Sequence, residues 1–284
     1  MSFRQITVIG TGLIGGSFAL AVRKAGFQGK IVGCDREHVL LQARDFGAID
    51  EAIASPEMAI KGSDLIVIAT PVGSIIDLIE RIGPLVPADA LITDVGSTKT
   101  EIMARAHDVF GDDVAHRFLP GHPMAGKEHA GVEYADANLF RDAVWLLTLY
   151  PGQNADQSRI PEFLDLLEKI GTQVVLFDPA QHDRVCALVS HLPQMLSTAF
   201  ASTLVDTIGD NPEAKSIGGR ALREMTRIAQ SPYSMWRDIA LTNTKNIQDA
   251  LLRLEQKLAH IRENLRTREL EEEFERAHTF GPKK

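Results

Sequence analysis

The stretch Ile6-Thr-Val-Ile-Gly10-Thr-Gly12-Leu13-Ile14-Gly15 decides the fold expected for this chain of 284 residues. An apolar run over Ile6–Ile9 leads directly into a G-x-G-x-x-G loop, and a helical pattern follows over Leu13–Lys24. In this context Gly10 permits a tight turn, Gly12 lets the backbone approach a pyrophosphate, and Gly15 allows close packing of the helix on the strand. The stretch therefore predicts a dinucleotide-binding loop, with cofactor contacts from Gly10, Gly12, Leu13, Ile14 and Gly15.

A carboxylate follows the second predicted strand, Lys30–Cys34, where an adenosine ribose would lie. Asp35 can accept hydrogen bonds from the ribose hydroxyls and would repel a 2′-phosphate, which favours NAD over NADP. Its neighbour Arg36 leaves the alternative open, because a guanidinium can pair with a 2′-phosphate or stack on adenine. We expect NAD as the cofactor, with NADP less favoured, and both residues as part of its site.

Strand and helix patterns alternate through the first half of the chain. Apolar runs without polar alternation are typical of strands buried on both faces, and strand–helix repetition predicts a parallel sheet. The predicted strands are Ile6–Ile9, Lys30–Cys34, Leu65–Thr70, Ala90–Asp94, Val144–Tyr150 and Gln173–Phe177. The predicted helices between them are Leu13–Lys24, His38–Phe46, Val72–Ile82, Lys99–Phe110 and Arg159–Ile170.

The pattern changes after Asp178, where no further strand is predicted and long helical patterns cover Gln181–Leu204 and Asn243–Leu265. The fold class is therefore an α/β domain over residues 1–178 followed by an all-α domain over residues 179–284. An apolar stripe recurs every three or four residues along the last long helix. Its members, Leu251, Leu254, Leu258, Ile261 and Leu265, face either the core or a second subunit.

Two predicted strands end in polar segments. Thr70 and Pro71 close the third strand, and Asp94 closes the fourth. Ligands of open α/β sheets bind at the carboxyl ends of the strands, so we expect these three residues at the cofactor.

Composition excludes several classes of partner. Lys and Arg total 30 against 38 Asp and Glu, a net charge of −8, which disfavours nucleic acid and anionic membranes as partners. A small anionic substrate needs only a local cluster of cations. No apolar run approaches a membrane span of about 18 residues, and none near Met1 resembles a signal peptide. The two cysteines, Cys34 and Cys186, suit a reducing compartment, so we expect a cytoplasmic protein.

One histidine stands out as a candidate for proton transfer. His122 lies between Gly121 and Pro123, and a residue before proline is held extended, which can aim the imidazole. Histidine also exchanges a proton near neutral pH. On a later helix Arg223 and Arg227 share a face, where a carboxylate ligand would relieve their repulsion.

A metal site or a hydrolase triad is not expected. His182, Cys186 and His191 lack the H-x-x-x-H or paired C-x-x-C spacing of metal ligands. Ser190, His191 and Asp183 lack a G-x-S-x-G elbow.

Four further motifs in order along the chain point to one family: Asp94-Val-Gly-Ser97, Gly121-His122-Pro-Met-Ala-Gly126, Ser190-His191-Leu-Pro193 and Thr226-Arg227-Ile-Ala…Met235-Trp236-Arg-Asp238. With the glycine loop, they resemble the prephenate/arogenate (cyclohexadienyl) dehydrogenases of tyrosine biosynthesis. The resemblance implies an N-terminal Rossmann domain and a helical C-terminal domain that forms a homodimer. It also implies NAD-dependent oxidative decarboxylation of prephenate to 4-hydroxyphenylpyruvate, or of arogenate to tyrosine.

The resemblance also implies roles for individual residues. His122 would take the proton of the ring hydroxyl, Ser97 would orient that hydroxyl and the nicotinamide, and Arg227 would bind a substrate carboxylate. Glu128 would lie at the entrance, and His191 and Trp236 in the pocket. One departure is Gln194, where many relatives have histidine near the substrate side chain. Another is Lys127, a cation that can attract a dianion.

Other functions remain open. The enzyme could be specific for arogenate, or could resemble β-hydroxyacid dehydrogenases, although their catalytic lysine has no counterpart after Pro179. A third alternative is an NAD sensor without catalysis, which would need neither His122 nor Arg227. The length leaves no room for a fused mutase or a regulatory domain of about 70 residues or more.

Overall fold

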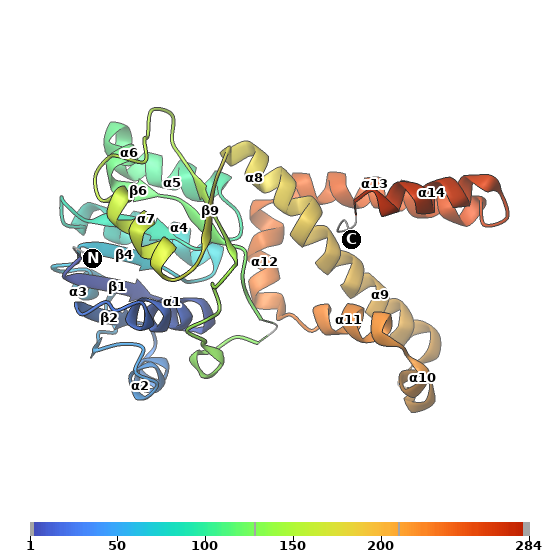
Figure 1. Ribbon diagram of the computed structural model, residues 1–284, viewed down its shortest axis with the longest axis horizontal. Helices are drawn as coiled ribbons and strands as arrows, with labels where there is room; N and C mark the ends of the chain where they lie inside the picture. The colour runs from blue at the N-terminus through green and yellow to red at the C-terminus, as the bar shows by residue number, and fades with distance from the viewer. Residues whose placement is uncertain (1–2, 128, 210, 281–284) are drawn as a thin grey trace.

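The computed structural model describes residues 3–127, 129–209 and 211–280, apart from the side chains of residues 214 and 215. A parallel sheet of six strands, in the order β3-β2-β1-β4-β5-β6, forms the centre of the first half (Figure 1). Its strands are β1 (Gln5–Ile9), β2 (Lys30–Cys34), β3 (Glu51–Ala52), β4 (Leu65–Ile68), β5 (Leu91–Asp94) and β6 (Phe118–Leu119).

Helices cover both faces of this sheet. They are α1 (Leu13–Lys24), α2 (Glu37–Asp45), α3 (Pro56–Ala59), α4 (Val72–Ile82), α5 (Thr100–Phe110) and α6 (Val114–Arg117). Successive residues of β4 alternate between two cores, because side chains along a strand point to opposite faces. Leu65 and Val67 enter one core, and Ile66 and Ile68 enter the other. The continuous apolar run of β4 is therefore buried on both faces of the sheet, as the sequence predicted.

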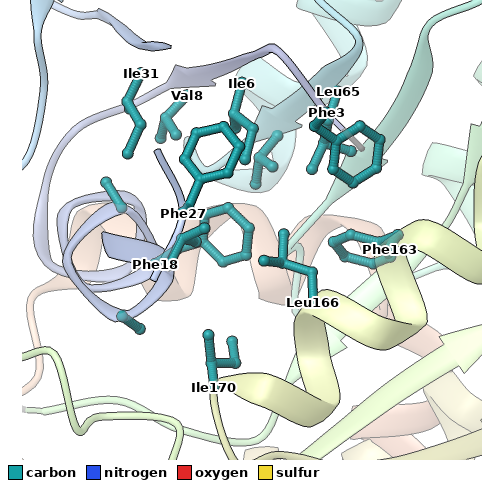
Figure 2. Packing of buried hydrophobic residues seen from close by; sticks show 14 of the residues in the cluster. Phe3, Ile6, Val8, Phe18, Phe27, Ile31, Leu65, Phe163, Leu166 and Ile170 are labelled. Atoms are coloured by element: carbon teal, nitrogen blue, oxygen red, sulfur yellow. The ribbon is translucent and has the colours of Figure 1, made fainter. Parts of the chain in front are cut away.

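The first core joins the sheet to a later helix, α7 (Ile160–Lys169). Figure 2 shows Phe18 and Phe27 packed between the strands and the α7 side chains Phe163 and Leu166. All four aromatic and aliphatic side chains are buried. At roughly 25 cal/mol per Å², such burial is the main source of stability here.

A separate sheet of three strands corrects the prediction of one parallel sheet. It contains β7 (Gly121–Pro123), β8 (Val144–Thr148) and β9 (Gln173–Phe177), with β7 antiparallel to β8. His122 therefore lies in a short strand rather than in a loop. The extended backbone before Pro123 suits pairing with β8, and three residues are too few for a recognisable strand pattern.

The second half is helical in the part that the structure describes. Its helices are α8 (Pro179–Cys186), α9 (Leu192–Ile208), α10 (Pro212–Ile217), α11 (Arg220–Ile228), α12 (Tyr233–Thr242), α13 (Thr244–Glu263) and α14 (Arg268–His278). One wide π-helical turn, Ala187–His191, joins α8 to α9. Pro193 explains that turn, since proline cannot donate to the carbonyl four residues earlier and its ring clashes there.

Figure 1 shows α12 against the sheet half, whereas α13 and α14 extend away from it. Along the apolar stripe, Leu251 packs on the small core around Ile239 and Ile247, but Leu258 and Leu265 remain half or more exposed. The stripe thus begins in a core and ends on an open face. No helix in the described ranges is long and apolar enough to cross a membrane.

Candidate functional site

The glycine loop connects β1 to α1. Gly10 has a φ of +90°, and a Cβ there would lie 2.5 Å from the Ala69 carbonyl oxygen. A Cβ at Gly15 would lie 1.9 Å from the Gly10 carbonyl oxygen. Gly12, by contrast, faces open space, with no atom of the described residues within 4 Å of its Cβ position. The loop therefore leaves its backbone open to a ligand at Gly12, before buried Leu13 and half-buried Ile14.

Polar groups around the loop suit a dinucleotide. The buried hydroxyls of Thr11 and Thr70 have no hydrogen-bond partner among the described residues. Asp35 accepts hydrogen bonds from the backbone N–H groups of Thr11 (2.8 Å) and Arg36 (2.7 Å). A carboxylate has about four acceptor positions, so Asp35 retains capacity for ribose hydroxyls. The Arg36 side chain and Pro71 are exposed.

Asp94 and Lys99 form a fully buried ion pair next to Gly121, the residue before His122. Asp94 also accepts from the backbone N–H groups of Gly96 (2.7 Å) and Gly121 (3.2 Å), and Lys99 donates to the Gly121 carbonyl at 2.7 Å. The pair thus ties the end of β5 to β7, beside His122. A direct contact between Asp94 and a cofactor stays a prediction. Lys99 was missed in the sequence, because a buried lysine has no local signal.

Three side chains from two distant segments form a chain of hydrogen bonds. His122 Nδ1 lies 3.0 Å from His182 Nε2, and His182 Nδ1 lies 2.9 Å from Asp183 Oδ1. Because a carboxylate only accepts, the Nδ1 proton of His182 points to Asp183, and its Nε2 accepts from Nδ1–H of His122. The network therefore leaves Nε2 of His122 with a free lone pair.

Electrostatics keep this network in a form that can accept a proton. Burial, then the neighbouring His182 and Lys99, hold the pKa of His122 well below 6.5. Although burial opposes ionisation, hydrogen bonds from His182, Thr100 and Lys99 lower the pKa of Asp183 to about 2. At neutral pH the site thus contains an ionised Asp183 and a neutral His122 imidazole.

A second histidine presents a donor. Asn243 Nδ2 donates to the Asp183 carbonyl at 2.8 Å and lies 3.2 Å from His191 Nδ1. Since the amide nitrogen only donates, the His191 proton resides on Nε2. That nitrogen and Trp236 Nε1 are buried without partners among the described residues, and the two rings lie edge to face at 5.8 Å. Buried donors without partners indicate a place for ligand oxygens.

The other predicted site residues have partners of their own. Gln194, buried on α9, donates to Thr198 Oγ1 at 3.3 Å, and the Lys127 ammonium donates to the Tyr134 carbonyl at 3.0 Å. Arg227 pairs with Glu224 on α11, with its side chain about half exposed. Ser97 is half-buried after β5. Glu128 lies outside the described residues.

Two carboxylates of the helical half hold helices of the sheet half at their N-termini. Asp183 accepts from the backbone N–H groups of Lys99 (2.7 Å) and Thr100 (2.9 Å), where α5 begins. Asp238 accepts from the Gly73 N–H in α4. Helix N-termini carry unpaired donors and a partial positive charge, so both contacts stabilise the junction between the halves.

Two domain models of one known protein family match this chain. The model of the prephenate dehydrogenase nucleotide-binding domain matches residues 18–176, and that of the prephenate dehydrogenase dimerization domain matches residues 178–278. The chain belongs to the prephenate dehydrogenase family. The Rossmann-type sheet and the helical second half predicted from the sequence are the two domains of this family.

The chain is also similar to individual prephenate dehydrogenases and to an arogenate dehydrogenase. A solved Aquifex aeolicus prephenate dehydrogenase, in complex with hydroxyphenyl propionate and NAD+, has 33% identity and a TM-score of 0.85, covering 98% of this chain and 96% of that one. Synechocystis arogenate dehydrogenase has 27% identity and a TM-score of 0.77, covering 97% and 98%. A Lactococcus lactis prephenate dehydrogenase is 35% identical over 84% of this chain, which spans 65% of the length of that relative.

Proposed function

We propose that this chain catalyses the NAD-dependent oxidative decarboxylation of prephenate to 4-hydroxyphenylpyruvate, a reaction of tyrosine biosynthesis. Arogenate, with an amino-acid side chain, is a further candidate substrate. The observation that carries the proposal is the chain from Asp183 through His182 to His122, which presents an unprotonated Nε2. A neutral imidazole held this way is a general base for a hydroxyl group.

In the proposed reaction His122 Nε2 accepts the proton of the ring hydroxyl, oriented by Ser97. Bound NAD supplies the acceptor for the hydride that leaves the same ring carbon. Carbon dioxide leaves from the opposite ring carbon, and the ring becomes aromatic. As the hydroxyl loses its proton, Asp183 stabilises positive charge on the paired histidines, since its carboxylate accepts from His182.

The proposed cofactor contacts come from the glycine loop and the neighbouring strand ends. The hydroxyls of Thr11 and Thr70, which have no hydrogen-bond partner in the described part of the chain, and the open approach at Gly12 support them. Asp35 would bind the ribose and disfavour NADP, and exposed Arg36 would lie against the adenine side. The remaining proposed contacts are Gly10, Leu13, Ile14, Gly15, Pro71 and Asp94.

Substrate recognition would rest on cations and buried donors. Arg227 and Lys127 would attract the carboxylates of prephenate, with Glu128 at the entrance. The N–H groups of His191 and Trp236, which lack partners within the ranges that the structure describes, support a pocket for ligand oxygens. Gln194 would lie near the side chain of the substrate, where its amide can donate to a keto acid or accept from an ammonium group.

We also propose a cytoplasmic homodimer, with the domain boundary at Asp178, between β9 and α8. Both cysteines are free and buried, which suits a reducing compartment. The helical half leaves many large apolar side chains exposed, which a second copy would cover. Among them are Val205, Tyr233, Leu241, Leu252, Leu258, Leu265 and Phe274.

The test is NADH formation by the purified protein with prephenate and with arogenate. We expect turnover with prephenate and NAD, and a loss of roughly 10²–10⁴ in kcat for His122→Ala with NAD binding retained. The matched control, His107→Ala, changes an exposed histidine of α5 and should keep normal turnover. NAD binding without turnover of either substrate would favour the sensor alternative, and near-normal turnover of His122→Ala would refute the role of His122.

A further inference from the structure

A buried cluster of nitrogen and sulfur ligands surrounds one side of His122. The Sγ atom of Cys186 lies 3.6 Å from His182 Nε2 and 4.0 Å from His122 Nδ1, and the two nitrogens lie 3.0 Å apart. All three residues are buried, and their ligand atoms lie within 4.8 Å of one another. His122 and His182 come from β7 and α8, and Cys186 lies one helical turn after His182 on the same helix.

These separations match the edges of a tetrahedral zinc site. With Zn–N near 2.0–2.1 Å and Zn–S near 2.3 Å, tetrahedral angles place two nitrogens about 3.4 Å apart and nitrogen and sulfur about 3.6 Å apart. The observed edges differ from these lengths by no more than a few tenths of an ångström. Because Nδ1 of His122 and Nε2 of His182 now face each other in a hydrogen bond, both imidazoles must also rotate so that their lone pairs converge on the ion. Two imidazoles and a thiolate also favour Zn²⁺ over Mg²⁺ or Ca²⁺, which prefer oxygen ligands.

The surroundings supply what such a site needs beyond its ligands. Histidines that bind metals usually donate their other N–H to a carboxylate, and His182 does so to Asp183. The positive charge of Lys99 would repel a bound cation. The buried carboxylate of Asp94 forms an ion pair with Lys99 and offsets that charge. His122 retains 7% exposure, so the cluster lies at the border of the interior and within reach of solvent.

We propose that His122, His182 and Cys186 form a site for a thiophilic divalent cation, Zn²⁺ above all, and that the bound ion inhibits the enzyme. The inhibition rests on the proposed function of His122, whereas the binding does not. To bind zinc through Nδ1, His122 must carry its proton on Nε2, so the lone pair that would accept the substrate proton disappears. Cys186 releases its thiol proton to solvent as the Zn–S bond forms, and three protein ligands leave the fourth position for water.

The experiment compares the wild-type protein with Cys186→Ala and with Cys34→Ala, which alters the other buried cysteine. Co²⁺ replaces Zn²⁺ as a spectroscopic probe, and a thiolate-to-cobalt charge-transfer absorption in the near ultraviolet is expected for wild type and Cys34→Ala. Cys186→Ala should lack this band. The zinc concentration for half inhibition should also rise at least about tenfold in Cys186→Ala. Removing a residue that only hydrogen-bonds to a metal ligand already weakens metal binding by about that factor, and Cys186 is itself a ligand in the proposed site. A chelator should restore activity, and Mg²⁺ should not inhibit.

A cobalt spectrum or zinc inhibition that is the same in wild type and Cys186→Ala would overturn the proposal, as would a wild-type enzyme indifferent to zinc. If Cys186→Ala does not fold, Cys186→Ser keeps the size of the side chain and serves the same comparison. The cobalt band needs no turnover. A failure of the metal site is therefore distinguishable from a failure of the proposed dehydrogenase activity, which is measured without added metal.

Discussion

The carboxylate of Asp238, on α12, accepts a hydrogen bond of 3.0 Å from the backbone N–H of Gly73, in the first turn of α4. The residue at the N-terminus of α4 is Pro71, which makes no side-chain cap. Asp238 therefore supplies from the helical half the acceptor that a local Ser or Asp normally supplies. Arg237, paired with the same carboxylate, keeps it in place.

Asp238→Ala should lower the free energy of unfolding by about 0.5–2 kcal/mol, the usual effect of losing an N-terminal cap. Because α4 begins directly after Thr70 and Pro71, the KM for NAD should rise as well. Urea unfolding and initial rates measure the two effects. Asp249→Ala, which removes an exposed carboxylate of α13, is the control and should change the free energy by less than about 0.5 kcal/mol. Equal behaviour of the two variants would argue against the capping role.

His182→Ala should lower kcat with little change in the KM for NAD. Without the acceptor at His182 Nε2, the Nδ1 proton of His122 loses its partner, and the imidazole is free to adopt the other tautomer. We expect a loss on the order of 10–10³-fold, because this residue positions the base rather than contacting the substrate. Steady-state kinetics across pH would also show a shifted acid limb. A variant with an unchanged pH profile would show that His182 is only a packing residue.

Asp35→Ala should weaken the preference for NAD over NADP. The carboxylate that would repel a 2′-phosphate disappears, while exposed Arg36 remains to pair with it. Ratios of kcat/KM for the two cofactors measure the change. The wild-type ratio is the reference, and equal use of both cofactors by the wild-type protein would show that Asp35 does not discriminate.

Arg227→Ala should mainly raise the KM for prephenate. A charge-assisted hydrogen bond to a carboxylate contributes about 1.5–3 kcal/mol, which corresponds to roughly 10–150-fold. Arg253→Ala, which removes an exposed arginine of α13, is the control with the same change in charge and should leave the KM for prephenate unchanged. An unchanged KM for Arg227→Ala would remove this residue from the substrate site.

Stability should fall when the pH is lowered below 6.5. Burial is the main cause that lowers the pKa values of two histidines from the unperturbed 6.5. The pKa of His122 lies well below that value, and the pKa of His191 is lowered to about 4. The unfolded chain binds these protons first, so their contribution is complete above pH 6.5 and is lost as the pH falls towards the folded values. Each group adds up to about 1.4 kcal/mol per pH unit. Urea unfolding at about pH 7 and pH 5 measures the change, and equal stabilities would contradict the buried neutral state.

Local patterns were sufficient for the long elements of the fold. Predicted and observed bounds agree for α1 and α4, because their apolar faces repeat over three turns, and for β2 and β9. The strands β3, β6 and β7 have two or three residues each, too few for any periodicity, and they exist because neighbouring strands pair with them.

The site was predictable in part. His122 and the glycine loop have local signals, whereas the link from His122 to His182 joins residues 60 positions apart. Asp183 accepts a hydrogen bond from the backbone N–H of Lys99, 84 positions away, and no local sequence pattern predicts that contact. The spacing of His182, Cys186 and His191 argues against a metal site, and the lack of a G-x-S-x-G elbow argues against a triad of Ser190, His191 and Asp183. Spacing rules describe ligands on one segment, and this cluster is assembled from a strand and a helix.

The carboxylates of Asp183 and Asp238 have a consequence for exchanging halves between relatives. Their partners in the sheet half are mainly backbone N–H groups, at Lys99, Thr100 and Gly73, which almost any sequence provides. A chimera with a foreign cofactor half should therefore keep these contacts as long as the helical half retains its two acids and a glycine faces Asp238, since a Cβ at Gly73 would lie 3.0 Å from that carboxylate. The link between His122 of the cofactor half and His182 of the helical half, by contrast, joins two side chains, so an exchange of halves must retain that pair of histidines.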